Sequence, residues 1–297
     1  MKKYDFKIHL ASHFGMCFGV RDAIIKTRDS FGVKGLTILG QLVHNPIVSE
    51  ELNRNGVQKA DLQKPANEIK GTVVITAHGA STKDKKAWES NDRKIIDTTC
   101  PLVHKAHQAL NQLVASGYFP VVIGKKDHAE VKGLIGDFPR SLVVQTDADI
   151  SNVPDKKKIG IVSQTTQRID KVELIVESIR SFRKDSDVKF VDTVCAPTKN
   201  RQTSAQELSK RCDLVFVVGG TNSNNTIQLV NTIKEFGSHP IHIQRASDID
   251  PCWLEGYYNV GLTAGTSTLK ETVMEVYETL EVISQNKFSN KKEKIVC

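Results

Sequence analysis

The segment DTTCPLVHKAHQAL, residues 97–110, places a cysteine directly before a proline and a helical pattern. Val103 and Leu110 repeat at the spacing of one helix face, and Pro101 suits the first helical position, where its missing N–H costs no hydrogen bond. The segment therefore predicts a helix with Cys100 at its N-cap. The free amides and the positive end of the helix dipole favour a thiolate there, which is the form of cysteine that attacks electrophiles or binds metals.

Around this segment, short β-branched runs alternate with helical patterns. The runs are VVIT at 73–76, PVVIG at 120–124, IGIVS at 159–163, LVFVVGG at 214–220 and NVGLT at 259–263. Each is followed by a turn and then a helical pattern, which is typical of parallel strands joined by helical crossovers. The sequence thus predicts an α/β fold, in which ligands gather at the carboxyl ends of the strands.

The cysteine of the opening segment has two counterparts. Cys17 in GMCFGVRDAI and Cys195 in DTVCAPTKNRQ also stand just ahead of helical patterns, so the three cysteines are 83 and 95 residues apart. A fixed internal register is the mark of a repeated structural unit. We therefore expect the three cysteines to occupy equivalent positions.

Two further sets of polar loops keep the same register. His44, His128 and Ser223 follow their cysteines by 27 or 28 residues. A second set comes later in each repeat and holds His78, Thr165 and Ser267. The repeated order predicts three similar α/β units with mostly parallel sheets, arranged pseudo-threefold around a central site.

The register also divides the chain. We expect a first α/β unit at 1–98, a second at 99–193, a third at 194–283 and a basic tail at 284–297. Each unit contributes one cysteine of the register. Cys212, Cys252 and Cys297 fall outside it, and Cys212 is expected in the core beside the strand at 214–220.

Composition narrows the class of protein. The 297 residues are 39% hydrophobic, which is enough for a buried core. No apolar run is long enough for a signal peptide or a membrane span, so we expect a cytoplasmic protein. The net charge of +7 suits a phosphorylated ligand, an acidic partner or nucleic acid. Scattered lysines and an aromatic content of 6% argue against nucleic acid.

Three converging thiolates favour a metal centre. Three are one fewer than the four that usually hold a [4Fe-4S] cluster, so one iron would stay open; with a histidine, they would also suit a closed zinc site. Histidines, hydroxyls and amides at strand ends are suited to a diphosphate. Glu130 could deliver a proton, and Thr165 could position a hydroxyl.

From residue 8 to residue 282 the sequence resembles the 4-hydroxy-3-methylbut-2-enyl diphosphate reductases of the non-mevalonate isoprenoid pathway. The stretches that carry the resemblance are MCFGVRDAI, VHNPIV, TAHGAS, DTTCPLVHKAH, HAEVKG, SQTT, the NRQ after Cys195, NSNN and TAGTST. Their common order makes the resemblance specific.

The resemblance implies a role for each site residue. Cys17, Cys100 and Cys195 resemble the three ligands of a [4Fe-4S] cluster with one open iron. Glu130 resembles the family's proton-delivering acid and Thr165 its partner for the substrate hydroxyl. The residues that resemble the diphosphate pocket are His44, His78, His128, Ser223, Asn224, Asn225 and Ser267.

The resemblance also implies the reaction and the partners. The hydroxyl of (E)-4-hydroxy-3-methylbut-2-enyl diphosphate binds the open iron, two electrons and two protons are added, and water leaves. The products are isopentenyl and dimethylallyl diphosphate. The electrons come from a reduced ferredoxin or flavodoxin, an acidic protein that a positive enzyme attracts. We expect a monomer.

The sequence departs from the family around its first cysteine. Phe14 and Phe18 flank Cys17 where family members usually carry arginine and alanine, and bulky groups near a cluster alter its solvent exposure and its potential. Asn224 stands where many members have serine, and its amide still donates a hydrogen bond.

Two other functions remain open from the residues alone. One is an enzyme with Cys100 as nucleophile and His78 or His128 as base. The other is a non-catalytic zinc or iron-sulfur protein. The first leaves Cys17 and Cys195 without a role, and the second leaves Glu130 idle.

Overall fold

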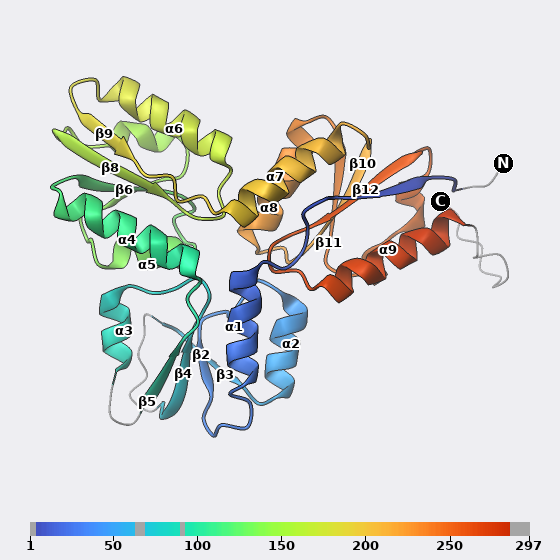
Figure 1. Ribbon diagram of the computed structural model, residues 1–297, viewed down its shortest axis with the longest axis horizontal. Coiled ribbons are helices and arrows are strands. Elements are labelled where there is room, and N and C mark those ends of the chain that lie inside the picture. The colour runs from blue at the N-terminus through green and yellow to red at the C-terminus, as the bar shows by residue number, and fades with distance from the viewer. Residues whose placement is uncertain (1–3, 63–68, 90–92, 286–297) are drawn as a thin grey trace. The chain divides into compact units, whose positions relative to one another are not determined.

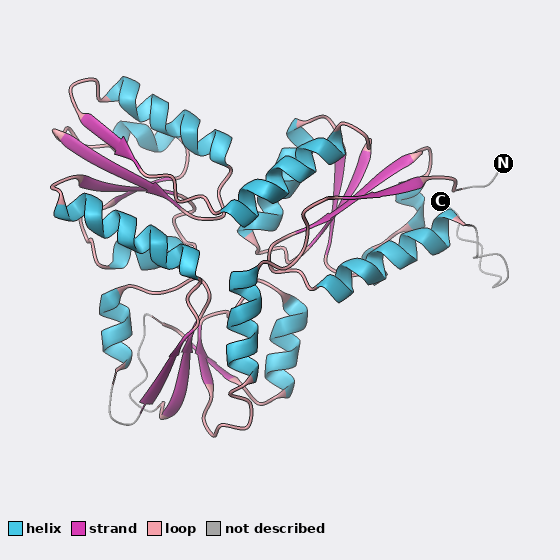
Figure 2. Cartoon of the chain, in the orientation of Figure 1, coloured by secondary structure: helices cyan, strands magenta, loops and turns pink. Residues whose placement is uncertain are grey.

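The computed structural model describes residues 4–62, 69–89 and 93–285, and its strands form three four-stranded parallel sheets (Figure 1). Helices lie on both faces of each sheet (Figure 2). The predicted α/β class and the five predicted strands are confirmed. Among the described residues, no helix is both long and apolar enough to cross a membrane.

The first sheet has the strand order β3-β2-β4-β5. Its strands are β2 (Thr37–Leu39), β3 (Gln58–Ala60), β4 (Gly71–Ile75) and β5 (Arg93–Asp97). The accompanying helices are α1 (Phe18–Arg28), α2 (Pro46–Arg54) and α3 (Thr82–Trp88). The side chain of Asn45 caps α2 by accepting the amides of Ile47 and Val48, so the helix begins two residues after His44.

The second sheet repeats this order as β7-β6-β8-β9. Its strands are β6 (Phe119–Ile123), β7 (Leu142–Val144), β8 (Lys158–Ser163) and β9 (Asp187–Phe190). Its helices are α4 (Pro101–Ala115), α5 (Ala129–Gly136) and α6 (Ile169–Phe182), with the 3-10 helix η1 (Asp147–Asn152). Both α4 and α6 bury one apolar stripe, which accounts for the helical spacing seen in their sequences.

The third sheet has the order β11-β10-β12-β1 and includes the N-terminal strand. Its strands are β10 (Leu214–Val218), β11 (His239–Ile243), β12 (Asn259–Ala264) and β1 (Lys7–Leu10). Its helices are α7 (Ala196–Ser209), α8 (Asn224–Glu235) and α9 (Lys270–Ser284), with the 3-10 helices η2 (Ala246–Asp248) and η3 (Pro251–Leu254).

The three sheets share one topology, since β1 takes in the third sheet the place that β5 and β9 take in the others. This confirms three similar units. It also corrects one detail, because β1 pairs with β12 and so lies outside the unit 1–98 in which the sequence analysis places it. The expected tail at 284–297 falls almost wholly outside the described residues.

Tertiary contacts group the chain into two compact units. The continuous unit is Phe18–Cys195 and contains the first and second sheets. The discontinuous unit combines Met1–Cys17 with Ala196–Cys297 and contains the third sheet.

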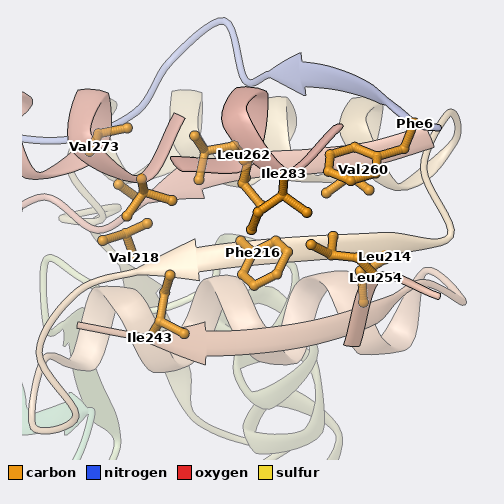
Figure 3. Packing of buried hydrophobic residues seen from close by; sticks show 13 residues of the cluster. Phe6, Leu214, Phe216, Val218, Ile243, Leu254, Val260, Leu262, Val273 and Ile283 are labelled. Atoms are coloured by element: carbon orange, nitrogen blue, oxygen red, sulfur yellow. The ribbon is translucent and has the colours of Figure 1, made fainter. Parts of the chain in front are cut away.

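The core of the discontinuous unit illustrates why the central strands read as unbroken apolar runs. All five residues of β10 are buried, because helices cover both faces of the sheet. Phe216 and Leu262 belong to one hydrophobic cluster, which also contains residues of α9 and of the neighbouring strands (Figure 3). On the other face, Val215 packs with Cys212, so the core position expected for that cysteine is confirmed.

Candidate functional site

The three cysteines of the register are half-buried and lie at the beginnings of three helices. Cys100 is the N-cap of α4, with Pro101 at the first helical position as predicted. Cys17 directly precedes α1, and Cys195 directly precedes α7. Each of the three cysteines therefore lies at the N-terminus of a helix.

The backbone holds all three cysteines in the same way. The amide of Cys100 donates to the carbonyl of Ala77 at 3.1 Å, that of Cys195 to Thr165 at 3.0 Å, and that of Cys17 to Thr266 at 3.0 Å. Each acceptor lies just beyond the strand next to the sheet edge, namely β4, β8 or β12. The register found in the sequence thus corresponds to one repeated structural position.

The Cys100 sulfur occupies a space that is open only because residue 19 is a glycine. Gly19, in the first turn of α1, lies so close that any Cβ atom there would overlap the Cys100 sulfur. A glycine is needed where another group must approach the backbone closely. Three thiols at helix starts, one of them accommodated by a missing side chain, are a donor set that suits an iron-sulfur cluster.

Three histidine rings gather in the continuous unit. The ring centroids are 4.5 Å apart for His44 and His78, 5.2 Å for His78 and His128, and 5.4 Å for His44 and His128. They follow β2, β4 and β6, at the carboxyl ends of strands where the sequence predicts ligand-binding groups.

Burial keeps the histidine triad neutral. It lowers the pKa of His44, lowers that of His78 well below its ordinary value, and lowers that of His128 to about 3. The ammonium of Lys125 also opposes protonation of His44 and His128, and protonation of one ring would oppose that of the next, so each pKa is lowered further. Bringing an anion among these rings favours their protonated forms, so the triad is suited to negative charge.

The tautomer of His128 distinguishes an anion from a metal ion. One ligand atom from each ring lies within 4.8 Å of the others, a spacing from which a metal could also be held. However, His128 Nδ1 accepts the amide of Glu130 at 3.2 Å, which leaves the proton of the neutral ring on Nε2. That N–H is a donor, so the arrangement favours an anion.

Glu130 and Thr165 form a buried pair. The amide of Thr165 donates to Glu130 Oε1 at 2.6 Å, and Thr165 Oγ1 donates to Oε2 at 3.0 Å. Desolvation raises the pKa of Glu130 to about 7, although both hydrogen bonds from Thr165 lower it. An acid that is partly protonated near neutrality is able to deliver a proton.

The remaining predicted residues lie in the discontinuous unit. Ser223 is the N-cap of α8, and its Oγ accepts the amide of Thr226. Asn225 Oδ1 accepts the amide of Thr266 at 2.9 Å, while its Nδ2 is buried without a hydrogen-bond partner in the described part of the chain. Asn224 and Ser267 are buried in the same segments. Amides and hydroxyls at a helix N-terminus suit a phosphate group.

The structure thus brings the predicted site residues together in two sets. The continuous unit holds His44, His78, His128, Glu130, Thr165, Cys100 and Cys195, and the discontinuous unit holds Cys17, Ser223, Asn224, Asn225 and Ser267.

One buried residue that supports the first set was not predicted from the sequence. Gln164, fully buried, accepts the amide of Lys125 with Oε1 and so ties the loop after β8 to the loop before His128. The only signal for it in the sequence is its place in SQTT, next to Thr165.

Comparison with known proteins decides the family. The family model described as LytB protein matches residues 8–281. The chain belongs to the LytB family. This confirms the family that the motif stretches suggest.

Two LytB family relatives match over nearly their whole length. The 4-hydroxy-3-methylbut-2-enyl diphosphate reductase of Geotalea daltonii is 36% identical over 283 residues, which cover 95% of this chain and 99% of the relative. The enzyme of the same name from Aquifex aeolicus is 34% identical, covering 94% of this chain and 97% of the relative.

Solved LytB-type structures share the fold. The E-1-hydroxy-2-methyl-but-2-enyl-4-diphosphate reductase of Plasmodium falciparum is 27% identical with a TM-score of 0.86, over 92% of this chain and 87% of that chain. A structure of (E)-4-hydroxy-3-methyl-but-2-enyl diphosphate reductase, the terminal enzyme of the non-mevalonate pathway, is 34% identical with a TM-score of 0.66, over 94% and 99%.

Proposed function

We propose that this LytB family chain reduces (E)-4-hydroxy-3-methylbut-2-enyl diphosphate to isopentenyl and dimethylallyl diphosphate. The observation that supports the proposal most directly is the set of hydrogen bonds that Thr165 makes. Thr165 binds Glu130 through its amide and hydroxyl, and its carbonyl accepts the amide of Cys195. An acid, a hydroxyl and the backbone of a cysteine that we propose as a metal ligand are therefore joined at one loop.

In the proposed site, Cys17, Cys100 and Cys195 hold a [4Fe-4S] cluster with one open iron. When bound, the cluster supplies electrons and a position for the substrate's hydroxyl oxygen. The equivalent positions of the three thiols at helix starts, and the space left by Gly19, support this ligand set.

The diphosphate would bind to the histidine triad and to the loops before α8 and after β12. His128 Nε2–H is a ready donor, and Asn225 Nδ2 is a buried donor whose partner the substrate would provide. Thr165 would orient the substrate hydroxyl. His128 and Asn225 are buried, so few water molecules would compete with the diphosphate for these donors.

Glu130 would deliver the protons. The overall step breaks one C–O bond and consumes two electrons and two protons. One proton leaves with the hydroxyl as water, and the other forms the new C–H bond. The pKa of Glu130, near 7, lets the carboxyl give up a proton and regain one at neutral pH.

The proposal also covers the electron donor, the oligomeric state and the location of the enzyme. The electron donor is a ferredoxin or flavodoxin, an acidic protein that complements the net charge of +7. The enzyme works as a monomer in the cytoplasm.

The test begins with iron and acid-labile sulfide per chain, measured on protein purified without oxygen. Mössbauer spectra with and without the hydroxylated allylic diphosphate follow. We expect near four irons per chain, one iron site that changes with substrate, and turnover with a chemical reductant. Zinc alone, or no metal, would overturn the proposal.

Single-cysteine variants test the ligand set. Replacing Cys17, Cys100 or Cys195 by serine should lower the iron content, because a hydroxyl is a much poorer ligand for iron than a thiolate. Cys212→Ala is the matched control, since Cys212 lies in the core outside the register. An intact cluster in Cys195→Ser would refute the three-ligand model.

A further inference from the structure

Arg201 is a buried cation that the proposed reaction leaves without a role. It lies in the second turn of α7, and only 7% of it is exposed. Burying an arginine is costly unless its donors are satisfied. Its partners therefore indicate what the side chain does.

The guanidinium binds backbone carbonyls of the Cys17 loop. Nε and Nη2 donate to the carbonyl of Gly15 at 3.0 and 2.5 Å, and Nη2 lies 3.5 Å from the carbonyl of Phe14. Nη1 donates to the carbonyl of Pro197 at 2.8 Å. One side chain thus ties the segment two residues before Cys17 to the first turn of α7, which begins directly after Cys195.

Main-chain hydrogen bonds hold the other side of the same loop. The amide of Gly15 donates to Ala264 at 3.1 Å, and the amide of Cys17 donates to Thr266 at 3.0 Å. These two bonds align the loop with the end of β12. Arg201 supplies the side-chain tie from α7, and Gly15 adopts a φ of +67°, which directs its carbonyl without strain because it has no Cβ.

We propose that Arg201 is a positioning residue, which fixes the Cys17 loop against α7 and thereby sets the place of the Cys17 thiolate as a cluster ligand. The proposal rests on the ligand role given to Cys17 above. A planar guanidinium with several donors spans two carbonyls, whereas a lysine ammonium acts as a point charge. Arg201 also places a positive charge against the Cys17 loop, which would favour the reduced state of a cluster bound by Cys17.

The experiment compares Arg201→Met and Arg201→Lys with wild type, with Arg211→Met as control because Arg211 is exposed. In the apoprotein, the alkylation rates of Cys17, Cys100 and Cys195 are followed by mass spectrometry. Buried Cys212 reports global unfolding. We expect both Arg201 variants to alkylate Cys17 at least several-fold faster, with the other three cysteines unchanged.

The reconstituted proteins separate geometry from charge. We expect Arg201→Met to hold less iron than wild type and its remaining cluster to have a lower midpoint potential. Arg201→Lys should recover part of the potential but not the slow alkylation of Cys17. Circular dichroism checks that each variant is folded.

Two failures are distinguishable. If wild type holds no cluster, the proposed function fails. If wild type holds one, and a folded Arg201→Met matches it in Cys17 alkylation, iron content and potential, the positioning role is overturned. Faster alkylation of all four cysteines would also overturn it, since that shows general loosening.

Discussion

Thr165 holds the carboxyl of Glu130 at both oxygens, through its amide to Oε1 at 2.6 Å and its hydroxyl to Oε2 at 3.0 Å. The two bonds stabilise the ionised carboxylate, while complete burial favours the neutral acid. Burial prevails, and the pKa rises to about 7. Thr165 therefore orients the carboxyl and keeps the pKa of Glu130 lower than burial alone would make it.

Glu130→Gln should keep the iron and lose turnover by at least about 100-fold, the usual range for loss of a general acid. The amide has nearly the same shape but carries no titratable proton. Iron content and steady-state turnover measure the two effects. The exposed Glu173→Gln on α6 is the matched control, and full activity of Glu130→Gln would exclude the proton-delivery role.

Wild-type turnover should fall as pH rises through about 7, because the deprotonated Glu130 has no proton to deliver. In the wild type, the hydrogen bond from the Thr165 hydroxyl lowers the pKa of Glu130. Thr165→Val removes that bond and should shift the decline to higher pH. The pH profile of turnover per bound cluster measures the shift. Thr165→Ser keeps the hydroxyl and should keep the wild-type midpoint, so an equal shift in both variants contradicts the explanation.

The strands that could be predicted from sequence are the inner ones. The apolar runs in β4, β6, β8, β10 and β12 are visible because both faces of each sheet are covered. Edge strands such as β3 and β9 are short and partly exposed, so they lack this signal. The pairing of β1 with β12 joins segments about 250 residues apart, and no local pattern encodes it.

The candidate site was predictable where it depended on repeated register. Cys100 as N-cap and the polar loops after β2, β6 and β10 follow from local sequence. Arg201 and Gln164 were not predictable in this way, because their roles depend on hydrogen bonds to backbone groups far along the chain. When a side chain binds a backbone group, the partner can be any type of residue, so the sequence at that position gives no sign of the contact.

Gly19→Ala should lower the iron content without unfolding the protein. An added Cβ would overlap the Cys100 sulfur, so that thiol must turn away from its position. In the apoprotein, alanine favours α1 by roughly 0.5–1 kcal/mol relative to glycine. Iron per chain and thermal unfolding of the apoprotein measure the two effects.

The control for this glycine is Lys26→Ala, an exposed position in the same helix. It should change neither the iron content nor the environment of Cys100. A Gly19→Ala protein with a full cluster would show that the close contact does not limit metal binding.

His107 should make the protein less stable in acid. Burial, Lys85 and His104 lower its pKa to about 4, whereas an unfolded histidine titrates near 6.5. Its contribution to stability is therefore complete above pH 6.5 and is lost as the pH falls toward 4. At pH 5 this loss amounts to about 2 kcal/mol.

Urea unfolding of the apoprotein at pH 7 and pH 5 measures this loss for wild type and for His107→Asn. The variant should lose less stability than wild type between the two pH values. The exposed His239→Asn is the control, and equal losses in wild type and His107→Asn would show that His107 gains no proton on unfolding.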